Sequence, residues 1–149
     1  MKKILLIEDD NFKAESLETF FYNFMPDCIV EIRTNLVESI EIINTQNFDW
    51  VMVDMSIPSH PIVPGEGAPV SFLTGGLDVI LELQALGRSD KCIIVTQYPE
   101  IEICGQFFHI NEAAHQININ FGCSIVGCIE YADNNISWKE NLEALLLSL

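Results

Sequence analysis

The chain has 149 residues, 49% of them hydrophobic, and it carries a formal net charge of −15 at pH 7. This length suits one domain that buries its own core, and the hydrophobic content excludes a disordered chain. The negative charge disfavours binding to nucleic-acid phosphates and favours a protein partner with basic patches.

The first residues and the cysteines indicate the compartment. The start MKKILLIEDD interrupts its apolar stretch with acidic residues too early for a signal peptide, and no apolar run approaches the roughly 20 residues of a membrane helix. Five cysteines, an odd number without C-x-x-C spacing, suit a reducing environment. We therefore expect a soluble cytoplasmic protein that does not enter the membrane.

Short apolar strands alternate with amphipathic helices along the chain, which favours an α/β layer structure. The expected strands cover residues 3–7, 28–33, 50–54, 91–96 and 124–131. The expected helices cover residues 11–24, 36–46, 77–87 and 138–149, and residues 99–121 suit one long or two short helices. Five β/α units without a linker predict one doubly wound domain over 1–149. Its five parallel strands follow the flavodoxin-like order 2-1-3-4-5, with helices on both faces.

Capping patterns and two long connections mark the ends of these elements. Asn35 with Glu38, and Ser137 with Glu140, have the spacing of a capping box at a helix start. Residues from about 55 to 76 are rich in Pro, Gly and Ser and predict a long loop before the third helix. Residues from about 99 to 122 form an extended fourth helical region before the last strand.

Carboxylates gather where two of the expected strands end. Glu8 and Asp9 follow the first strand, and Asp54 ends the third. Doubly wound folds bind ligands outside the carboxyl ends of their strands. If these two strands are neighbours, their tips lie about 5 Å apart, and the clustered charges need neutralisation. A hard divalent cation such as Mg²⁺ would neutralise them and keep positions open for water and a phosphoryl group.

The stretches ILLIEDD, VMVDMSIP and CIIVT, in this order and at these strand ends, resemble the receiver domain of two-component response regulators. The resemblance covers nearly the whole chain. It places the family's acidic pair on Glu8 and Asp9, its phospho-accepting aspartate on Asp54 and its hydroxyl residue on Thr96. It implies that Asp54 accepts a phosphoryl group from a phosphohistidine on a histidine kinase or a phosphotransfer protein.

The resemblance also implies a cofactor and a role for each site residue. Mg²⁺ would be held by Asp9, Asp54 and the main-chain carbonyl of Ser56, with Glu8 binding through water. The Thr96 hydroxyl would donate to a phosphoryl oxygen. Such a chain is a Mg²⁺-dependent phosphoacceptor and not an enzyme in the usual sense, although self-dephosphorylation stays open.

One family feature is missing from the sequence. The family places a lysine just after its fifth strand, and alignment of the last helix puts Asn134 there. Lys139 follows one turn into the helix and could reach back. The aromatic residue that the family couples to its hydroxyl position falls on Tyr131, so Thr96 and Tyr131 form the expected switch pair.

Two functions of different classes stay open. The first is a stand-alone receiver without an output domain that is phosphorylated on Asp54 and signals through contacts with an unknown downstream protein. The second is a phosphorylation-independent pseudo-receiver that acts as a binding module, which Asn134 and the two long connections favour. A Mg²⁺-dependent phosphohydrolase ranks last because Ser56 stands where such enzymes place a second carboxylate. Whether the chain forms a homodimer also stays open.

Overall fold

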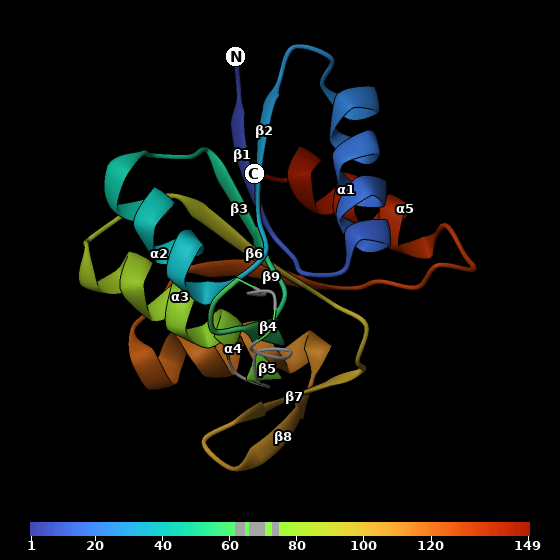
Figure 1. Cartoon of the computed structure of the whole chain (residues 1–149). Helices are drawn as coiled ribbons and strands as arrows, with labels where there is room; N and C mark the ends of the chain where they lie inside the picture. Colours follow the sequence, from blue (N-terminus) through green and yellow to red (C-terminus); the bar gives the residue numbers. More distant parts are fainter. Residues whose placement is uncertain (62–64, 66–70, 73–74) are drawn as a thin grey trace.

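A computed structural model describes residues 1–61, 65, 71–72 and 75–149. Five parallel strands form its central sheet in the order β2-β1-β3-β6-β9, as Figure 1 shows. Counted along this sheet, the order is the predicted 2-1-3-4-5. The strands are β1 (Lys3–Ile7), β2 (Ile29–Arg33), β3 (Trp50–Val53), β6 (Lys91–Thr96) and β9 (Ile125–Glu130).

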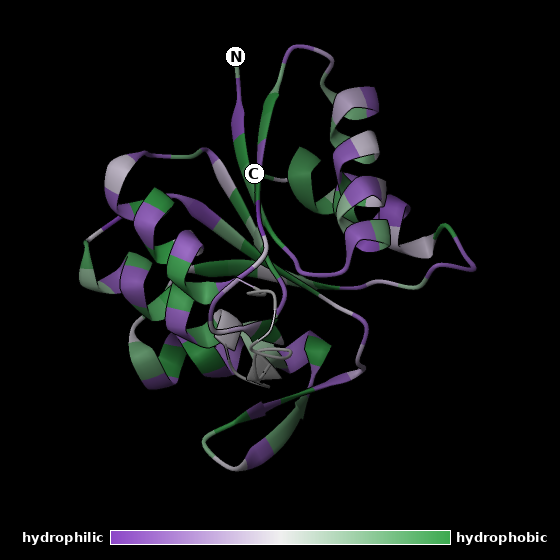
Figure 2. Ribbon diagram, viewed as in Figure 1, coloured by the Kyte–Doolittle hydropathy of each residue, from purple (hydrophilic) through white to green (hydrophobic). Residues whose placement is uncertain are grey.

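Helices cover both faces of this sheet, which confirms the predicted doubly wound fold. One face carries α1 (Asn11–Phe24) and α5 (Ser137–Leu147), and the other carries α2 (Leu36–Thr45), α3 (Gly75–Ala85) and α4 (Ile110–Phe121) (Figure 1). In Figure 2 hydrophilic and hydrophobic residues are interspersed along the helices, as expected of helices with one buried side. Among the described residues, no helix has the length and apolar character needed to cross a membrane.

The core is divided into two by the sheet. Along β1, Ile4 and Leu6 point into the cluster beneath α1 and α5, whereas Leu5 and Ile7 point into the cluster beneath the other helices. This alternation follows from the two-residue period of a strand. Because both faces of the central strands are buried, their sequences are almost continuously apolar.

Of the two predicted capping boxes, the structure confirms the first and contradicts the second. Asn35 caps α2: its Oδ1 accepts from the Glu38 N–H at 2.9 Å, and its Nδ2 donates to Glu38 Oε2 at 2.8 Å. The box of Ser137 and Glu140 is wrong, because α5 begins at Ser137 itself, and its N-cap position is Ile136, which makes no side-chain capping bond. Asn135 lies before the helix, and its Oδ1 accepts from the Ser137 N–H at 3.1 Å.

The segment predicted as a loop over 55–76 contains two short strands. β4 (Ile57–Pro58) pairs antiparallel with β5 (Ser71–Phe72), so the prediction is wrong for these residues. Most of the segment between them, 62–64 and 66–70, lies outside the described residues, as do 73–74. A proline fits this pairing because short edge strands tolerate the loss of one N–H donor.

A β-hairpin replaces the helix that was predicted at the start of the region 99–122. β7 (Glu100–Ile103) pairs antiparallel with β8 (Gln106–His109), and α4 begins only at Ile110. Cys104 and Gly105 connect the strands with φ values of 52° and 80°, which a tight two-residue hairpin turn requires. In β7 the buried Ile101 and Ile103 alternate with glutamates, which is the pattern of a strand.

Candidate functional site

Three carboxylates meet beyond the ends of β1 and β3. The parallel register pairs Ile7 with Val53, so the residues that follow them leave the sheet at the same edge. Glu8, Asp9 and Asp54 each bring one carboxylate oxygen within 4.8 Å of the others. Glu8 is 2% exposed and Asp54 8%, whereas Asp9 is open to solvent. The structure thus brings together the acidic residues that the sequence placed at this edge.

Main-chain hydrogen bonds fix both buried carboxylates. The Asp54 N–H donates to the Ile7 carbonyl at 3.0 Å, and the Ser56 N–H lies 3.4 Å from Asp54 Oδ1. Glu8 Oε1 accepts from the Asp10 N–H at 3.0 Å. Asp10 also caps α1, since its Oδ1 accepts from the Lys13 N–H at 3.2 Å. The first turn of α1 and the end of β1 are therefore held as one unit.

Lys13 lies at the centre of the site, and the sequence analysis missed it. Its side chain is fully buried, with Nζ 2.5 Å from Glu8 Oε2 and 3.6 Å from Asp54 Oδ2. Nζ also donates to the Val95 carbonyl at 2.9 Å, at the end of β6. The sequence did contain a signal for a buried lysine, because Lys13 lies four residues before Leu17 and therefore on the same buried face of α1. A charge on the apolar face of a helix requires a buried partner.

Burial changes the acidity of both carboxyl groups. It raises the pKa of Glu8 from 4.5 to about 7, against the opposing effect of Lys13 and with a further upward contribution from Asp54. Burial also raises the pKa of Asp54, again opposed by Lys13. The single positive charge of Lys13 does not neutralise three ionised carboxylates. The all-oxygen donor set, with Asp9 on the solvent side, fits a hard divalent cation such as Mg²⁺.

Thr96 and Tyr131 are joined through the main chain. The Tyr131 N–H donates to the Thr96 carbonyl at 2.7 Å, and the Thr96 hydroxyl accepts from the Tyr98 N–H at 3.2 Å. Both side chains are buried, and burial raises the pKa of the Tyr131 phenol. The Tyr131 ring lies 5.0 Å from the Trp138 ring, and its centroid is 5.8 Å from Lys13 Nζ. The expected switch pair therefore adjoins the buried lysine.

Asn134 and Lys139 lie apart from the carboxylates. Asn134 is exposed on the connection between β9 and α5, where it lines a surface hollow with Ser16 of α1. Lys139 does not reach back to Asp54, because its Nζ lies over the Trp138 ring, 5.5 Å from the centroid. Within the described part of the chain, the ion pairs of Glu8 and Asp54 are made by Lys13.

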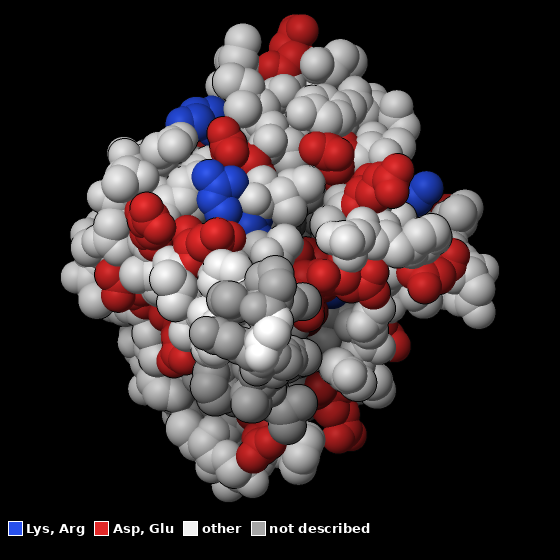
Figure 3. Space-filling view, in the orientation of Figure 1, with Lys and Arg blue, Asp and Glu red and all other residues white. Residues whose placement is uncertain are grey.

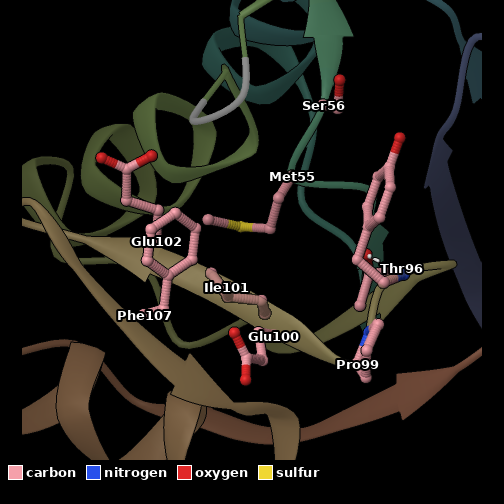
Figure 4. A pocket seen from close by; sticks show the side chains of 9 residues that line it. Met55, Ser56, Thr96, Pro99, Glu100, Ile101, Glu102 and Phe107 are labelled. Atoms are coloured by element: carbon pink, nitrogen blue, oxygen red, sulfur yellow. Dashed lines mark hydrogen bonds between the residues drawn. The ribbon is translucent and has the colours of Figure 1, made fainter.

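A hollow of about 360 Å³ opens beside the site. Figure 4 shows that Met55 and Ser56, which follow Asp54, line it together with Thr96 and residues of the β7-β8 hairpin. Its lining is Met55, Ser56, Thr96, Tyr98, Pro99, Glu100, Ile101, Glu102 and Phe107. Figure 3 shows many acidic and few basic side chains on the face in view. The hollow itself combines the carboxylates of Glu100 and Glu102 with apolar side chains such as Phe107.

No protein-family model matches the chain. It is 31% identical over 148 residues to the Detocs response regulatory protein DtcB of Vibrio alginolyticus, an alignment that covers 97% of this chain and 99% of the relative. It is 18% identical over 148 residues to the uncharacterized protein y4jR of Sinorhizobium fredii, with 99% of this chain and 98% of the relative covered.

Solved receiver structures share the fold. The N-terminal domain of a response regulator/sensory box/GGDEF protein from Carboxydothermus hydrogenoformans has a TM-score of 0.66 and 17% identity, covering 99% of this chain and 92% of that chain. The response regulator TrrA of Thermotoga maritima, in complex with Mg²⁺ and BeF, has a TM-score of 0.61 and 19% identity, with 97% and 99% covered. With the DtcB relative aligned over nearly its full length, this chain belongs to the response-regulator family and has the receiver fold.

Proposed function

We propose that this receiver accepts a phosphoryl group on Asp54 from a phosphohistidine of a histidine kinase or phosphotransfer protein in the cytoplasm. The observation that carries the proposal is the position of the Asp54 carboxylate, which shares one pocket with Glu8 and Asp9 beyond the sheet. The proposed output is contact with another protein, in line with the chain's acidic charge.

Transfer of the phosphoryl group from the phosphohistidine to Asp54 forms one O–P bond and breaks one P–N bond. An Asp54 carboxylate oxygen attacks phosphorus, and the P–N bond of the phosphohistidine breaks. The bond's electron pair goes to the imidazole nitrogen, and the ring leaves as neutral imidazole, either because its other nitrogen already carried a proton or because the freed nitrogen takes one from water. Asp54 becomes an acyl phosphate, which is then lost by transfer or by hydrolysis. In this proposal the chain acts as a phosphoacceptor, and hydrolysis of its own acyl phosphate is a second way to lose the group.

The residues around Asp54 would bind Mg²⁺, orient the Asp54 carboxylate and contact the phosphoryl group. Asp9, Asp54 and the Ser56 carbonyl would hold Mg²⁺, with Glu8 bound through water, and the ion would offset charge on the phosphoryl oxygens. The Ser56 N–H, 3.4 Å from Asp54 Oδ1, orients the carboxylate. The Thr96 hydroxyl would rotate from its present contact and donate to a phosphoryl oxygen. The response regulator TrrA, which has the same fold, is in complex with Mg²⁺ and BeF, and this supports Mg²⁺ as the cation of the proposal.

A phosphorylation-independent binding module is the second candidate. It is favoured by Lys13, because an ammonium that is paired with Glu8 and Asp54 already neutralises part of the acidic cluster. In that case the receiver fold would present a constant surface to its partner, and Asp54 would serve only in the buried charge network.

A phosphorylation assay of Asp54 distinguishes the phosphoacceptor from the phosphorylation-independent binding module. The protein is incubated with Mg²⁺ and a small phosphodonor, or with an autophosphorylated histidine kinase, and intact mass is measured before and after alkali. We expect an alkali-labile phosphoprotein in the wild type and none in Asp54→Asn. The matched control is Asp133→Asn, which makes the same change at an exposed position and should be labelled like the wild type. No labelling of the wild type by either donor would contradict the proposed phosphoacceptor and favour the binding module.

A further inference from the structure

The charge environment of Asp54 depends on one residue of α1. Within the residues that the structure describes, Lys13 supplies the cation paired with Glu8 and with Asp54. Its ammonium touches groups at the ends of three neighbouring strands: Glu8 after β1, Asp54 after β3 and the Val95 carbonyl in β6. Asn134, at the position of the family lysine, is neutral and exposed.

The lysine is held in place along its whole length. Its N–H donates to the Asp10 cap, and its side chain is enclosed within the sheet face that α1 covers. Its closest partner, Glu8, is in turn fixed by the Asp10 N–H. The ammonium is therefore oriented before any ligand arrives. Fixed charges of this kind act strongly because no reorganisation is needed when negative charge develops beside them.

Stability alone is a poor explanation for this lysine. Burial of an ammonium and two carboxylates costs several kcal/mol per ion in general, and a buried ion pair seldom gains more than an apolar replacement would. At position 13 an apolar side chain would extend the buried stripe that includes Leu17 and Phe21. The lysine instead places its charge beside the carboxylate that is proposed to be phosphorylated, with 3.6 Å between Nζ and Asp54 Oδ2.

We infer that Lys13 is the phosphoryl-binding cation of this receiver, delivered from α1 and not from the connection after β9. This inference rests on the proposed function. Conversion of Asp54 to an acyl phosphate removes the negative charge from its carboxylate and places negatively charged phosphoryl oxygens beyond the bridging oxygen, next to the carboxyl group. The Nζ donor that faces Asp54 then binds a phosphoryl oxygen, while the contacts with Glu8 and the Val95 carbonyl keep the ammonium in place.

The test measures binding of a phosphoryl mimic in Lys13→Met. Methionine keeps the length of the stem and removes only the charge and the donors. Calorimetry measures the affinity for Mg²⁺ alone, and then for beryllofluoride at saturating Mg²⁺. We expect Lys13→Met to bind beryllofluoride about 10-fold to 100-fold more weakly, the usual effect of losing a charge-assisted hydrogen bond. Its affinity for Mg²⁺ alone should be unchanged or higher, because a competing cation is gone.

Lys139→Met is the matched control. It makes the same change at an exposed lysine of α5, so it should bind both probes like the wild type. Equal beryllofluoride affinity in Lys13→Met and the wild type would overturn the inference and leave the proposed function intact. If the wild type binds no beryllofluoride and is not labelled, the proposed function fails and the inference fails with it.

A second measurement covers the case in which Lys13→Met does not fold. The side-chain ammonium signals of ¹⁵N-labelled wild-type protein are recorded by NMR with Mg²⁺, before and after beryllofluoride. The buried ammonium of Lys13 is shielded from exchange with water, and we expect its signal to shift on addition of the mimic. A signal that does not move would overturn the inference.

Discussion

Lys13 of α1 and Glu8 at the end of β1 form a solvent-excluded ion pair, with 2.5 Å between Nζ and Oε2. This contact places a positive charge from the first helix inside the acidic pocket that contains Asp54. It also holds the first turn of α1 against the edge of the sheet where ligands bind in doubly wound folds.

The elevated pKa of Glu8 makes stability depend on pH. Folded Glu8 is half-protonated at about pH 7 and unfolded Glu8 near 4.5, so the folded state binds more protons between these values, and the pair with Lys13 is fully ionised only above pH 7. The free energy of unfolding therefore falls as pH rises from 4.5 to 7 and then levels off. The contribution is on the order of 3 kcal/mol for such a shift.

Glu8→Gln removes this titration. In urea denaturation without Mg²⁺, the stability of the variant relative to the wild type should increase from pH 4.5 to 7. Glu15→Gln, at an exposed position of α1, should follow the wild-type profile. Parallel profiles for wild type and Glu8→Gln would contradict the prediction.

Binding of Mg²⁺ should release protons. The cation favours ionised carboxylates, and burial raises the pKa of both Glu8 and Asp54. We expect the affinity for Mg²⁺ to rise from pH 6 toward neutral pH and to change less above it. Calorimetry in two buffers of different ionisation enthalpy measures the protons released, and identical heats in both buffers at pH 6 would disprove this linkage.

Gly76 is expected to be required for the shape of the acceptor loop. A Cβ at this position would lie 2.7 Å from the Met55 Cα and would collide with the Asp54 carbonyl. Since main-chain atoms must move, Gly76→Ala should destabilise the fold by about 1–3 kcal/mol and slow the labelling of Asp54. In Gly127→Ala the three atoms nearest to the new Cβ all belong to the flexible Leu145 side chain, so urea denaturation should show a smaller loss.

The Thr96 hydroxyl is predicted to contribute to phosphorylation through its hydrogen bonding and not through the volume of the side chain. Thr96→Val keeps the volume but leaves the Tyr98 N–H without its acceptor, at a cost of about 1 kcal/mol. We expect slower labelling of Asp54 by a small phosphodonor in this variant. Thr96→Ser keeps the hydroxyl and should retain most of the rate. Equal initial rates for the valine and serine variants would show that the hydroxyl does not contact the phosphoryl group.

A substitution at Phe107 should separate binding of the partner protein from phosphorylation of Asp54 itself. It is 68% exposed and lines the hollow that includes Met55 and Thr96. Phe107→Ser should change stability by no more than about 0.5 kcal/mol and leave labelling by a small phosphodonor unchanged. Transfer from a phosphorylated partner protein should slow, whereas Ile119→Ser, 60% exposed on α4, should have no effect. Unchanged transfer in Phe107→Ser would exclude the hollow from the partner's binding surface.

The main elements of the fold follow from local sequence patterns. The apolar runs of the central strands and the helical spacing of α1 depend on neighbouring residues only, so their bounds are readable without a structure. The meeting of Glu8 with Asp54 is also predictable, because the carboxyl ends of adjacent parallel strands share one edge.

The rest depends on long-range contacts or on special backbone conformations. The alternation in β7 is a readable signal of a strand, but the β7-β8 turn requires a positive φ at Cys104, which is rare outside glycine and cannot be read from the sequence. The role of Lys13 depends on a partner 82 residues away, the Val95 carbonyl, and on an acidic pocket formed by two other strands. The sequence by itself determined that a cluster of carboxylates must be neutralised. Only the tertiary structure decided that a helix supplies one of the charges, since that requires burial of the side chain from several sides at once.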